Sequence, residues 1–495
     1  MHLKKLIENI NIKNLTGQTD VEISRVNYDS RKIRPGDLFV AMKGHAQDGH
    51  DFIGDAVSKG AAAVLSDMAP DSVIQKLSRK PNHMPVFLQV SDSRRALSQL
   101  AVAFYQTPFH NMNLIGITGT NGKTTTSYIL ESILLAAGRK PGVIGTVNRR
   151  ISNSVLKSSV TTPESLDLMK ILREMADQSA TDVVMEVSSH ALDQGRVMDC
   201  SFRTVIFTNI TRDHLDYHQS MDAYFKAKSL LFTGLSDKVS AIINTDDPRG
   251  TDLITLTAAK TMTYGLNNSC DVTAKDVNVS REGIIAKLIS KKMGEIDIQS
   301  SLIGNFDIYN IMAAAAAAVT LGVDLKTIAL GIENMTGVPG RMELVPNARS
   351  LAIVVDYAHT PDALGKALGA VNQITGGRIL TVFGCGGDRD KGKRNEMGRI
   401  AGKYSHKVFI TSDNPRSENP TAIADEIERG VIASGQKNYV IELERETAIR
   451  MAVQSAQKKD LVLIAGKGHE DYQIIGNTRR DFDDRLVAAR AASLS

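Results

Sequence analysis

The sequence reads Gly116-Ile117-Thr118-Gly119-Thr120-Asn121-Gly122-Lys123-Thr124-Thr125 between an apolar run at 114–117 and a helix-like run that extends to about Ala137. Gly138 follows as the expected stop of that helix. Glycines let backbone N–H groups turn toward phosphate oxygens, and the helix N-terminus adds positive potential. Lys123 supplies a mobile charge, and a threonine hydroxyl suits Mg²⁺. The segment therefore predicts a cradle for a nucleoside triphosphate.

The spacing of this loop departs from the common pattern G-x-x-x-x-G-K-[ST], because Ile117 stands five residues before Gly122. A glycine-rich turn ahead of a helix is the structural alternative, but such a turn has no need of the Lys-Thr pair. A second glycine cluster at 384–389 resembles the start of a dinucleotide fingerprint, yet Arg389 stands where its third glycine should be. The sequence therefore disfavours NAD(P) or FAD binding.

Strand-like and helix-like segments alternate on both sides of the loop. Apolar runs that end in polar or glycine-containing loops occur at 114–117, 182–187, 204–208, 241–244, 352–356, 379–384, 407–411 and 461–465. This spacing predicts parallel sheets covered by helices on both faces. An alternating, β-like stretch at 274–303 precedes an alanine-rich helix at 310–321, whose small side chains suit close packing on a sheet.

The 495 residues exceed what one hydrophobic core accommodates and suggest about three domains. The Pro81–Pro85 segment and the run Gly337-Val338-Pro339-Gly340 interrupt the pattern. We expect an α/β protein with a smaller N-terminal α/β domain at 1–90. A central, doubly wound, phosphate-loop ATPase-like domain follows at 91–340, and a C-terminal Rossmann-like α/β domain at 341–495.

Composition and charge exclude several classes of protein. Hydrophobic residues make up 42% and charged residues 23%, which is typical of a globular chain, and the net charge of +4 is dispersed, so nucleic acid is not an expected partner. Three cysteines without a CxxC pair predict neither disulfides nor a thiolate zinc site. The N-terminus lacks a signal-peptide core and the longest apolar stretch is too short to span a bilayer. We expect a cytoplasmic monomer without membrane insertion.

Five motifs occur in one order: Gly119–Thr125, Glu186-Val187-Ser188-Ser189-His190, Thr208-Asn209-Ile210-Thr211-Arg212-Asp213-His214-Leu215-Asp216, Asp356-Tyr357-Ala358-His359-Thr360-Pro361 and Gly466-Lys467-Gly468-His469-Glu470. Together they resemble the Mur ligases, with matching segments from about Asp29 to Asp484. Within this family the chain is similar to members that add the third residue, normally meso-diaminopimelate, to UDP-N-acetylmuramoyl-L-Ala-D-Glu.

The resemblance implies an ATP-dependent amide synthesis in bacterial cell-wall assembly, with ATP and Mg²⁺ as cofactors. The chemistry is consistent, because a carboxylate is a poor electrophile. Phosphorylation of the D-Glu γ-carboxylate gives an acyl phosphate with a competent leaving group, which a neutral amine attacks. ATP activation would need the middle domain, and amine delivery would need the last domain to close over it.

The resemblance also implies residues for ATP and metal binding. The ATP-binding set is Gly119, Thr120, Asn121, Gly122, Lys123, Thr124, Thr125, Asn310 and Arg341. The catalytic set is Lys123, Glu186, His214 and Lys228, and the metal set is Thr124, Glu186, His214 and Lys228. Lys228 matches a lysine that the family carries as a carbamate (N6-carboxylysine), since an ammonium would repel Mg²⁺ and a carbamate would bind it. Asp307 stands where the family commonly has Asn, so an adenine contact is not assigned to it.

Two further sets are implied for the substrates. UDP-sugar and peptide contacts match Ser30, His45, Thr161, Thr162, Ser188, Gln194 and Arg196. Diaminopimelate contacts match Arg394, Asp413, Asn414, Pro415, Arg416, Gly466 and Glu470. The run Asp413–Arg416 marks diaminopimelate-adding members, because Arg offers a planar fork to the extra carboxylate of that substrate. Glu470 suits the ammonium group on the same distal carbon.

Several alternatives remain open at this stage. His214 and His218 form an i,i+4 pair, but Leu215 stands where a zinc hydrolase would carry Glu. Glu186 on its own could be a helix cap or a surface acid. A folylpolyglutamate-type synthetase shares the loop and the acyl-phosphate chemistry but has no need of Asp413–Arg416. A phosphate-loop switch protein would release ADP without the ligase substrates.

Overall fold

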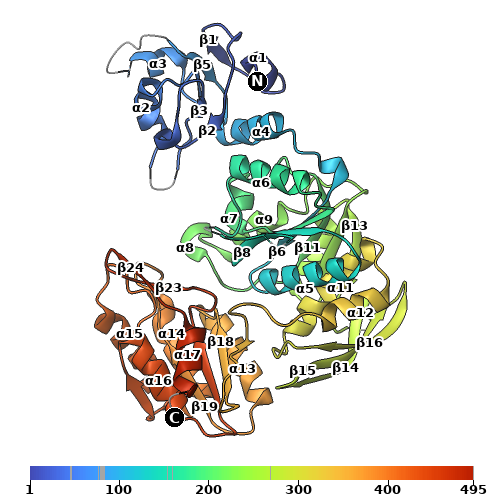
Figure 1. The fold of residues 1–495 in the computed structure, drawn as a ribbon, viewed down its shortest axis with the longest axis vertical. Helices are drawn as coiled ribbons and strands as arrows, with labels where there is room; N and C mark the ends of the chain where they lie inside the picture. The colour runs from blue at the N-terminus through green and yellow to red at the C-terminus, as the bar shows by residue number, and fades with distance from the viewer. Residues whose placement is uncertain are drawn as a thin grey trace. The chain divides into compact units, whose positions relative to one another are not determined.

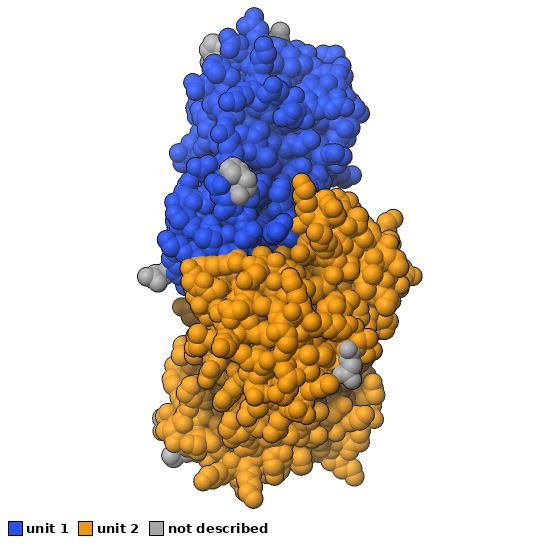
Figure 2. All heavy atoms as spheres, turned by 90° about the vertical axis from the view of Figure 1, so that its right-hand side faces the viewer, with its two compact units in different colours: residues 1–116, 140–203 blue, residues 117–139, 204–495 orange. Residues whose placement is uncertain are grey.

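The computed structural model describes residues 1–44, 47–75, 77, 84–152, 154–158, 160–267 and 269–493. The chain forms two compact units, one of residues 1–116 and 140–203 and the other of residues 117–139 and 204–495 (Figure 2). His45 and most of the Pro81–Pro85 segment lie outside the described residues. In the part of the chain that is described, no helix combines the length and apolar character needed to cross a bilayer.

The first unit begins with a five-stranded sheet in the order β1-β5-β4-β3-β2. Its strands are β1 (Asn14–Thr16), β2 (Val26–Asn27), β3 (Leu38–Val40), β4 (Ala63–Ser66) and β5 (Val86–Gln89), with helices α2 (Ile53–Ser58) and α3 (Pro70–Gln75) between them. All neighbours are parallel except β1 and β5. Phe39 and Phe87 anchor its core. Helix α4 (Ser93–Tyr105) follows, and the Asp92 side chain caps its first turn.

The remainder of the first unit carries one of the five sequence motifs, the run 186–190. Strands β7 (Pro141–Ile144) and β10 (Asp182–Glu186) pair in parallel, and β8 (Asn148–Ile151) and β9 (Ser154–Lys157) extend β7 as antiparallel strands. Helix α6 (Ser165–Asp177) precedes β10, and α7 (Ser189–Asp193) follows it. All five residues of β10 are buried, and the strand ends at Glu186. The polar motif therefore lies at the carboxyl end of a buried parallel strand, as predicted.

The second unit begins with the phosphate-loop helix α5 (Lys123–Ala136), and β6 (Asn113–Thr118) spans the boundary between the units. Strands β11 (Phe202–Phe207), β12 (Ser240–Asn244), β13 (Lys260–Tyr264) and β14 (Val272–Ser280) are parallel, and β15 (Gly283–Ser290) and β16 (Gly294–Ser300) continue as antiparallel strands. Helices α11 (Asp307–Thr320) and α12 (Leu325–Glu333) pack against α5 (Figure 1). The alanines at 313–318 are fully buried, which confirms the tight packing expected of that helix.

The C-terminal part of the second unit is a six-stranded sheet in the order β17-β18-β22-β19-β20-β21. Its strands are β17 (Glu343–Leu344), β18 (Ala352–Asp356), β19 (Ile379–Phe383), β20 (Lys407–Ile410), β21 (Tyr439–Ile441) and β22 (Leu461–Ala465), all parallel except β17. Helices α13 (Pro361–Ile374), α14 (Gly392–Tyr404) and α15 (Pro420–Ala433) share one hydrophobic core. Helices α16 (Arg445–Ser455) and α17 (Asp484–Ser493) share the other.

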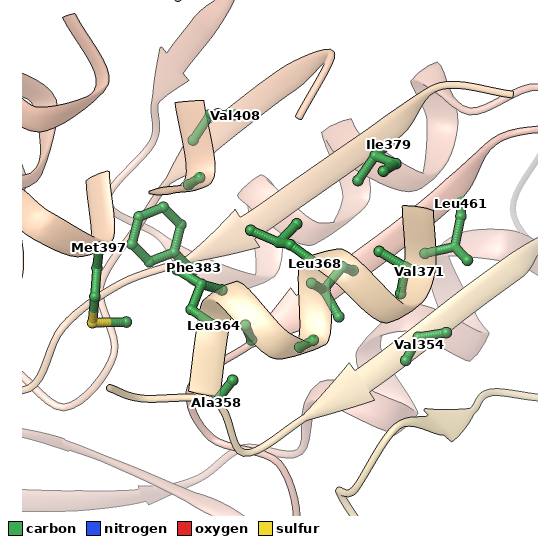
Figure 3. Packing of buried hydrophobic residues seen from close by; sticks show 14 of the residues in the cluster. Val354, Ala358, Leu364, Leu368, Val371, Ile379, Phe383, Met397, Val408 and Leu461 are labelled. Carbon is green, nitrogen blue, oxygen red and sulfur yellow. The ribbon is translucent and has the colours of Figure 1, made fainter. Parts of the chain in front are cut away.

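Figure 3 shows how the first of these cores is built. Leu364, Leu368 and Val371 of α13 point toward the strands that carry Val354 and Phe383. The sheet is buried on both faces, and for this reason its strands are nearly continuous apolar runs. The doubly wound α/β prediction is confirmed. A separate hairpin of β23 (Tyr472–Ile475) and β24 (Thr478–Asp481) follows the last parallel strand.

Candidate active site

The phosphate loop of the second unit has the backbone that its glycines predict. Gly119 and Gly122 both have positive φ angles, of 152° and 87°. A β-carbon at Gly119 would collide with Thr208 Oγ1, and one at Gly122 would collide with Asn310 Oδ1. Lys123 folds over the loop and donates to the carbonyls of Gly119 at 2.7 Å and Thr120 at 2.9 Å. The loop is thus pre-shaped around its own lysine.

Loop side chains are held by neighbouring residues of the same unit. The backbone N–H of Asn121 donates to Asn209 Oδ1 at 3.0 Å. Asp362, in the first turn of α13, accepts from Asn121 Nδ2 at 3.1 Å and from Thr211 Oγ1 at 2.9 Å. Lys366 donates to the same carboxylate oxygen at 2.9 Å. The sequence analysis did not single out Asp362, although the motif at 356–361 ends one residue before it.

Lys228 lies directly beside the loop. It comes from α9 (Met221–Ser229), has only 1% of its surface exposed, and donates to Gly119 O at 2.9 Å. Its Nζ lies 4.5 Å from the centre of the Tyr224 ring. Burial, and repulsion from the Lys123 charge, hold the pKa of Lys228 well below its ordinary value. A lysine in such surroundings is not the solvated lysine that a helix surface usually carries.

His214 precedes the short helix α8 (Leu215–His218) and has a left-handed backbone with φ of 53°. Burial lowers the pKa of His214, and the positive charges of Lys123 and Lys228 add to this against the opposing effect of Asp213. This lowered pKa favours the neutral form of His214, which is the form that can coordinate a metal ion. Its ring lies 6.1 Å from that of Tyr224.

Glu186 belongs to the first unit and is 1% exposed. Its Oε1 accepts from the backbone N–H of Thr146 at 2.9 Å, and its Oε2 accepts from the Thr146 hydroxyl at 2.8 Å. The Thr146 hydroxyl also lies 3.1 Å from Thr161 Oγ1. Thr146 thus orients the carboxylate, and no sequence motif pointed to it.

Most of the residues expected to contact the UDP-sugar peptide are connected within the first unit. Arg196 donates to the Thr162 carbonyl at 2.9 Å and to Gln194 Oε1 at 2.7 Å. The Thr162 hydroxyl lies 3.4 Å from Ser188 Oγ. Ser30 lies in a separate turn that follows Asp29; it is the buried residue of that turn, and its carbonyl accepts from Lys59 Nζ at 3.0 Å.

The segment that was expected to lie near adenine centres on Asn310. This residue donates to Asp307 Oδ1 at 2.9 Å, and its own Oδ1 accepts from Thr126 at 3.4 Å. Burial raises the pKa of Asp307 to about 7 against the opposing hydrogen bonds from Asn310 and Gly304. Asp307 therefore has an internal role, and no adenine contact is needed to explain it. Arg341 stacks over the Tyr357 ring at 4.4 Å.

Two motifs of the C-terminal sheet meet at its carboxyl edge. Asn414 Nδ2 donates to Glu470 Oε2 at 2.9 Å, which joins the run 413–416 to the run 466–470. Gly466 has a φ of 114°, and a β-carbon there would lie 2.7 Å from Asp413 Oδ2. The second glycine cluster has a similar explanation, because β-carbons at Gly384 and Gly387 would collide with the backbone of the run 411–415.

The three arginines near this edge have different surroundings. Arg416 donates to the Gly387 carbonyl at 2.7 Å. Arg394 is 1% exposed and forms ion pairs with Glu418 at 2.9 Å and Glu426 at 3.2 Å, so its charge is already compensated inside the protein. Arg389 is exposed, and its side chain, like that of Arg416, would contact a β-carbon placed on Gly386. Its guanidinium forms no hydrogen bond or ion pair with any described residue. In the sequence, Arg389 stood out only as a departure from a glycine fingerprint.

Metal-binding residues were expected at Thr124, Glu186, His214 and Lys228. No cluster of three or more His, Cys, Asp and Glu side chains that could hold a metal occurs among the described residues. The expected set is instead a hydroxyl, a carboxylate, a neutral imidazole and a buried lysine. This set fits a hard divalent cation if the lysine carries a carbamate, since oxygen donors then predominate.

Comparison with known proteins is consistent with this geometry. Three family models match consecutive parts of the chain: the catalytic domain of the Mur ligase family at residues 22–105, the Mur ligase middle domain at 117–318, and the Mur ligase glutamate ligase domain at 340–468. The chain belongs to the Mur ligase family. Its matched regions include every described residue discussed above as part of the loop, the Glu186 network and the motif at 413–416.

Curated relatives match this Mur ligase over almost its full length. The UDP-N-acetylmuramoyl-L-alanyl-D-glutamate–2,6-diaminopimelate ligase of Geobacter sulfurreducens is 44% identical, with 99% of this chain and 98% of that protein covered. The ligase of the same name from Bacillus licheniformis is 43% identical, with 99% of each chain covered. A solved structure of a ligase of that name is 32% identical with a TM-score of 0.70, covering 100% of this chain and 99% of the other. The MurF ligase of Thermotoga maritima, solved with ADP, shares the fold at 21% identity and a TM-score of 0.63, covering 90% and 94%.

Proposed function

We propose that this Mur ligase uses ATP to join meso-2,6-diaminopimelate to the D-Glu γ-carboxylate of UDP-N-acetylmuramoyl-L-Ala-D-Glu, in the synthesis of peptidoglycan precursors. The observation that carries the proposal is the meeting of the runs 413–416 and 466–470, which combines Arg416 with Glu470 at one sheet edge. A guanidinium and a carboxylate together complement a carbon that carries both a carboxylate and an ammonium group. The names of the relatives support the same substrate.

The reaction requires a carboxylate to become an electrophile. The loop at 119–125 would hold the ATP phosphates, with Lys123 turning from its two loop carbonyls to the transferred phosphoryl group. Transfer to the γ-carboxylate gives an acyl phosphate and ADP. The neutral amine of the amino acid then attacks the acyl carbon, and an amide bond forms as the bond to phosphate breaks and a proton leaves the nitrogen.

Thr124, Glu186, His214 and carbamylated Lys228 would hold Mg²⁺, which supplies screening of the negative charges that the reaction brings together. Formation of the carbamate joins Lys228 Nζ to the carbon of CO₂ with loss of one proton. The position of Lys228 beside Gly119 and its complete burial support this assignment. Asn310 and Arg341 would lie on the nucleoside side of ATP.

The UDP-sugar peptide would be bound by the connected residues of the first unit. Arg196 offers N–H groups to a substrate carboxylate, while Thr161, Thr162, Ser188 and Gln194 offer hydroxyl and amide groups. Ser30 and His45 would contribute from the N-terminal region. We assign nucleotide-sugar binding to 1–90, ATP binding to 91–340 and amino-acid binding to 341–495. We place the enzyme in the cytoplasm as a monomer that acts on small molecules only.

For the amino acid, Arg389 is a better partner of Arg416 than Arg394. The guanidinium of Arg394 is held by Glu418 and Glu426, whereas that of Arg389 is exposed. We assign the contact with the distal carboxylate to Arg416 and Arg389. Arg394 would then act indirectly, by fixing Glu418 and with it the segment that follows Arg416.

The test is a panel of amino acids assayed for ADP release in the presence of UDP-N-acetylmuramoyl-L-Ala-D-Glu. We expect release that depends on both the nucleotide-sugar peptide and diaminopimelate, with the tripeptide product detected by mass spectrometry. Faster use of L-lysine than of diaminopimelate would overturn the substrate assignment. Equal ADP release without either substrate would indicate a nucleotide hydrolase instead of a ligase.

A further inference from the structure

Lys467 has an unusual position at the edge where the two amino-acid motifs meet. Its side chain is 0% exposed, although it is a lysine in a loop that follows β22. Its Nζ donates to Glu470 Oε2 at 2.9 Å and to Asn414 Oδ1 at 3.3 Å. The Tyr472 ring lies 5.3 Å from the same nitrogen. A lysine is rarely buried in full unless its charge has a partner, and here the partner is Glu470.

The three side chains form a closed triangle. Asn414 Nδ2 also donates to Glu470 Oε2 at 2.9 Å, so that one carboxylate oxygen accepts from both Lys467 and Asn414. The backbone N–H of Ile474 donates to Asn414 Oδ1 at 2.9 Å and fixes the amide in this orientation. Glu470 Oε1 accepts no hydrogen bond from any described residue. The triangle therefore fixes the carboxylate through one oxygen and leaves the other for a ligand.

The other charged groups near this triangle have partners of their own or belong to the proposed substrate contact, apart from Arg479, which stacks over the Tyr472 ring at 3.9 Å. Arg445 is fully buried but is paired with Asp484 at 2.7 Å. Asp413 accepts from the backbone N–H of Asn414 at 2.7 Å. Arg416 donates to Gly387 and lies toward the loop on which Arg389 is exposed. Lys467 is thus the cation that directly neutralises Glu470.

We propose that Lys467 is a positioning and specificity residue for the amino-acid substrate. It aims Glu470 at the distal ammonium, and it cancels the charge of Glu470 so that the edge favours a distal carbon of zero net charge. That carbon in diaminopimelate carries one ammonium and one carboxylate, whereas in lysine it carries an ammonium alone. Removal of the buried positive charge should favour lysine relative to diaminopimelate, because a more negative site attracts the net cation. The inference rests on the proposed function.

The experiment uses two substitutions of this residue in the full-length enzyme. Lys467→Met retains the length of the side chain but removes both the charge and the hydrogen bonds. Lys467→Gln removes the charge but retains an N–H group that can donate. Lys407→Met is the matched control, because Lys407 lies over Phe409 in β20 of the same sheet and outside both motifs. Each protein is assayed with diaminopimelate and with L-lysine at saturating ATP and nucleotide-sugar peptide.

The readout is the ratio of kcat/KM for diaminopimelate to kcat/KM for L-lysine. This ratio does not depend on the amount of folded enzyme, because the same molecules turn over both substrates. For Lys467→Met we expect the KM for diaminopimelate to rise at least about tenfold and the ratio to fall about tenfold, while the KM for ATP changes little. Lys467→Gln should show the same fall in the ratio with a smaller rise in KM, and Lys407→Met should resemble the wild type.

A ratio within twofold of the wild type in Lys467→Met would overturn the inference. A wild-type ratio in Lys467→Gln beside a fall in Lys467→Met would overturn the charge argument, because the two variants lack the same charge. Failure of the proposed function would look different, since the unsubstituted enzyme would then not use diaminopimelate.

Discussion

Asp307 provides a quantitative test because its carboxyl is buried and forms no ion pair with any residue that the structure describes. Its pKa rises from 3.8 to about 7, chiefly because burial disfavours the ionised form. Between these two values the folded protein keeps a proton that the unfolded chain has lost, so stability must fall as pH rises through this window. Integrating the two titrations from pH 5 to pH 8 gives a loss of roughly 2–3 kcal/mol from this residue alone.

Asp307→Asn should remove that loss, because an amide does not ionise. The hydrogen bonds of Asp307 to Asn310 and Gly304 change on substitution, but their contribution is the same at every pH. The stability of the variant relative to the wild type should therefore increase by roughly 2–3 kcal/mol between pH 5 and pH 8. Hydrogen exchange of amides in α11, compared between the two proteins at the same pH, should slow in the variant by a further factor of roughly 30–150 over that range.

Asp324→Asn is the matched control. Asp324 caps α12, where it accepts from the Thr327 hydroxyl at 2.7 Å and from the backbone N–H of Thr327 at 3.0 Å, and these hydrogen bonds lower the pKa of its exposed carboxyl. It is ionised in both states throughout this pH range, so its substitution should change stability by an amount that does not vary from pH 5 to pH 8. An equally flat difference for Asp307→Asn would refute the reasoning that the buried carboxyl keeps its proton.

Three further predictions concern activity. Lys228→Ala should abolish ligation and make the enzyme insensitive to added bicarbonate, and a steady-state assay with turnover at the wild-type rate would exclude the carbamate role. Arg416→Ala should raise the KM for diaminopimelate at least about tenfold while ATP binding measured by calorimetry changes little, because a buried substrate carboxylate loses its charged partner. Asp362→Ala should weaken ATP binding or slow ligation, because it releases Asn121. Lys366→Ala leaves the hydrogen bonds between Asp362 and the loop intact and should have neither effect. Equal kinetics for the two variants would contradict this role of Asp362.

The fold was predictable from the sequence because its signals are local. Apolar runs that end in glycine or polar residues marked the parallel strands, and Gly138 with a φ of 71° ends the loop helix as expected. The positive φ angles of Gly119 and Gly122 follow from the need for phosphate-facing amides. Residues whose role depends on partners distant in sequence, such as Thr146 beside Glu186, gave no such signal.

The buried position of Arg394 could have been predicted from the helical spacing of its neighbours. Arg394 begins a run of positions at helical spacing with Met397, Gly398 and Ala401, and all four are buried in α14. That spacing places the arginine on the inward face of its helix, where it needs internal carboxylates, and Glu418 and Glu426 supply them. Arg389 precedes the helix and has no such constraint. Helical periodicity, applied to a polar segment, would have separated the two arginines.

Discrimination between amino acids depends on how rigidly the two motifs are joined. Arg416 has a left-handed backbone with φ of 51°, a conformation that costs about 1 kcal/mol or more for a residue with a side chain. Two backbone hydrogen bonds to the β23–β24 hairpin hold it there, from Arg416 N to Ile474 O at 3.2 Å and from Gly476 N to Arg416 O at 2.8 Å. That hairpin begins two residues after Glu470, so hydrogen bonds to the hairpin tie the backbone of Arg416 to the segment that follows Glu470. The spacing of the two residues is therefore set before any substrate arrives. On the proposed assignment, a lysine that lacks the distal carboxylate would leave Arg416 with the Gly387 carbonyl and without an anionic partner, instead of drawing the two residues together.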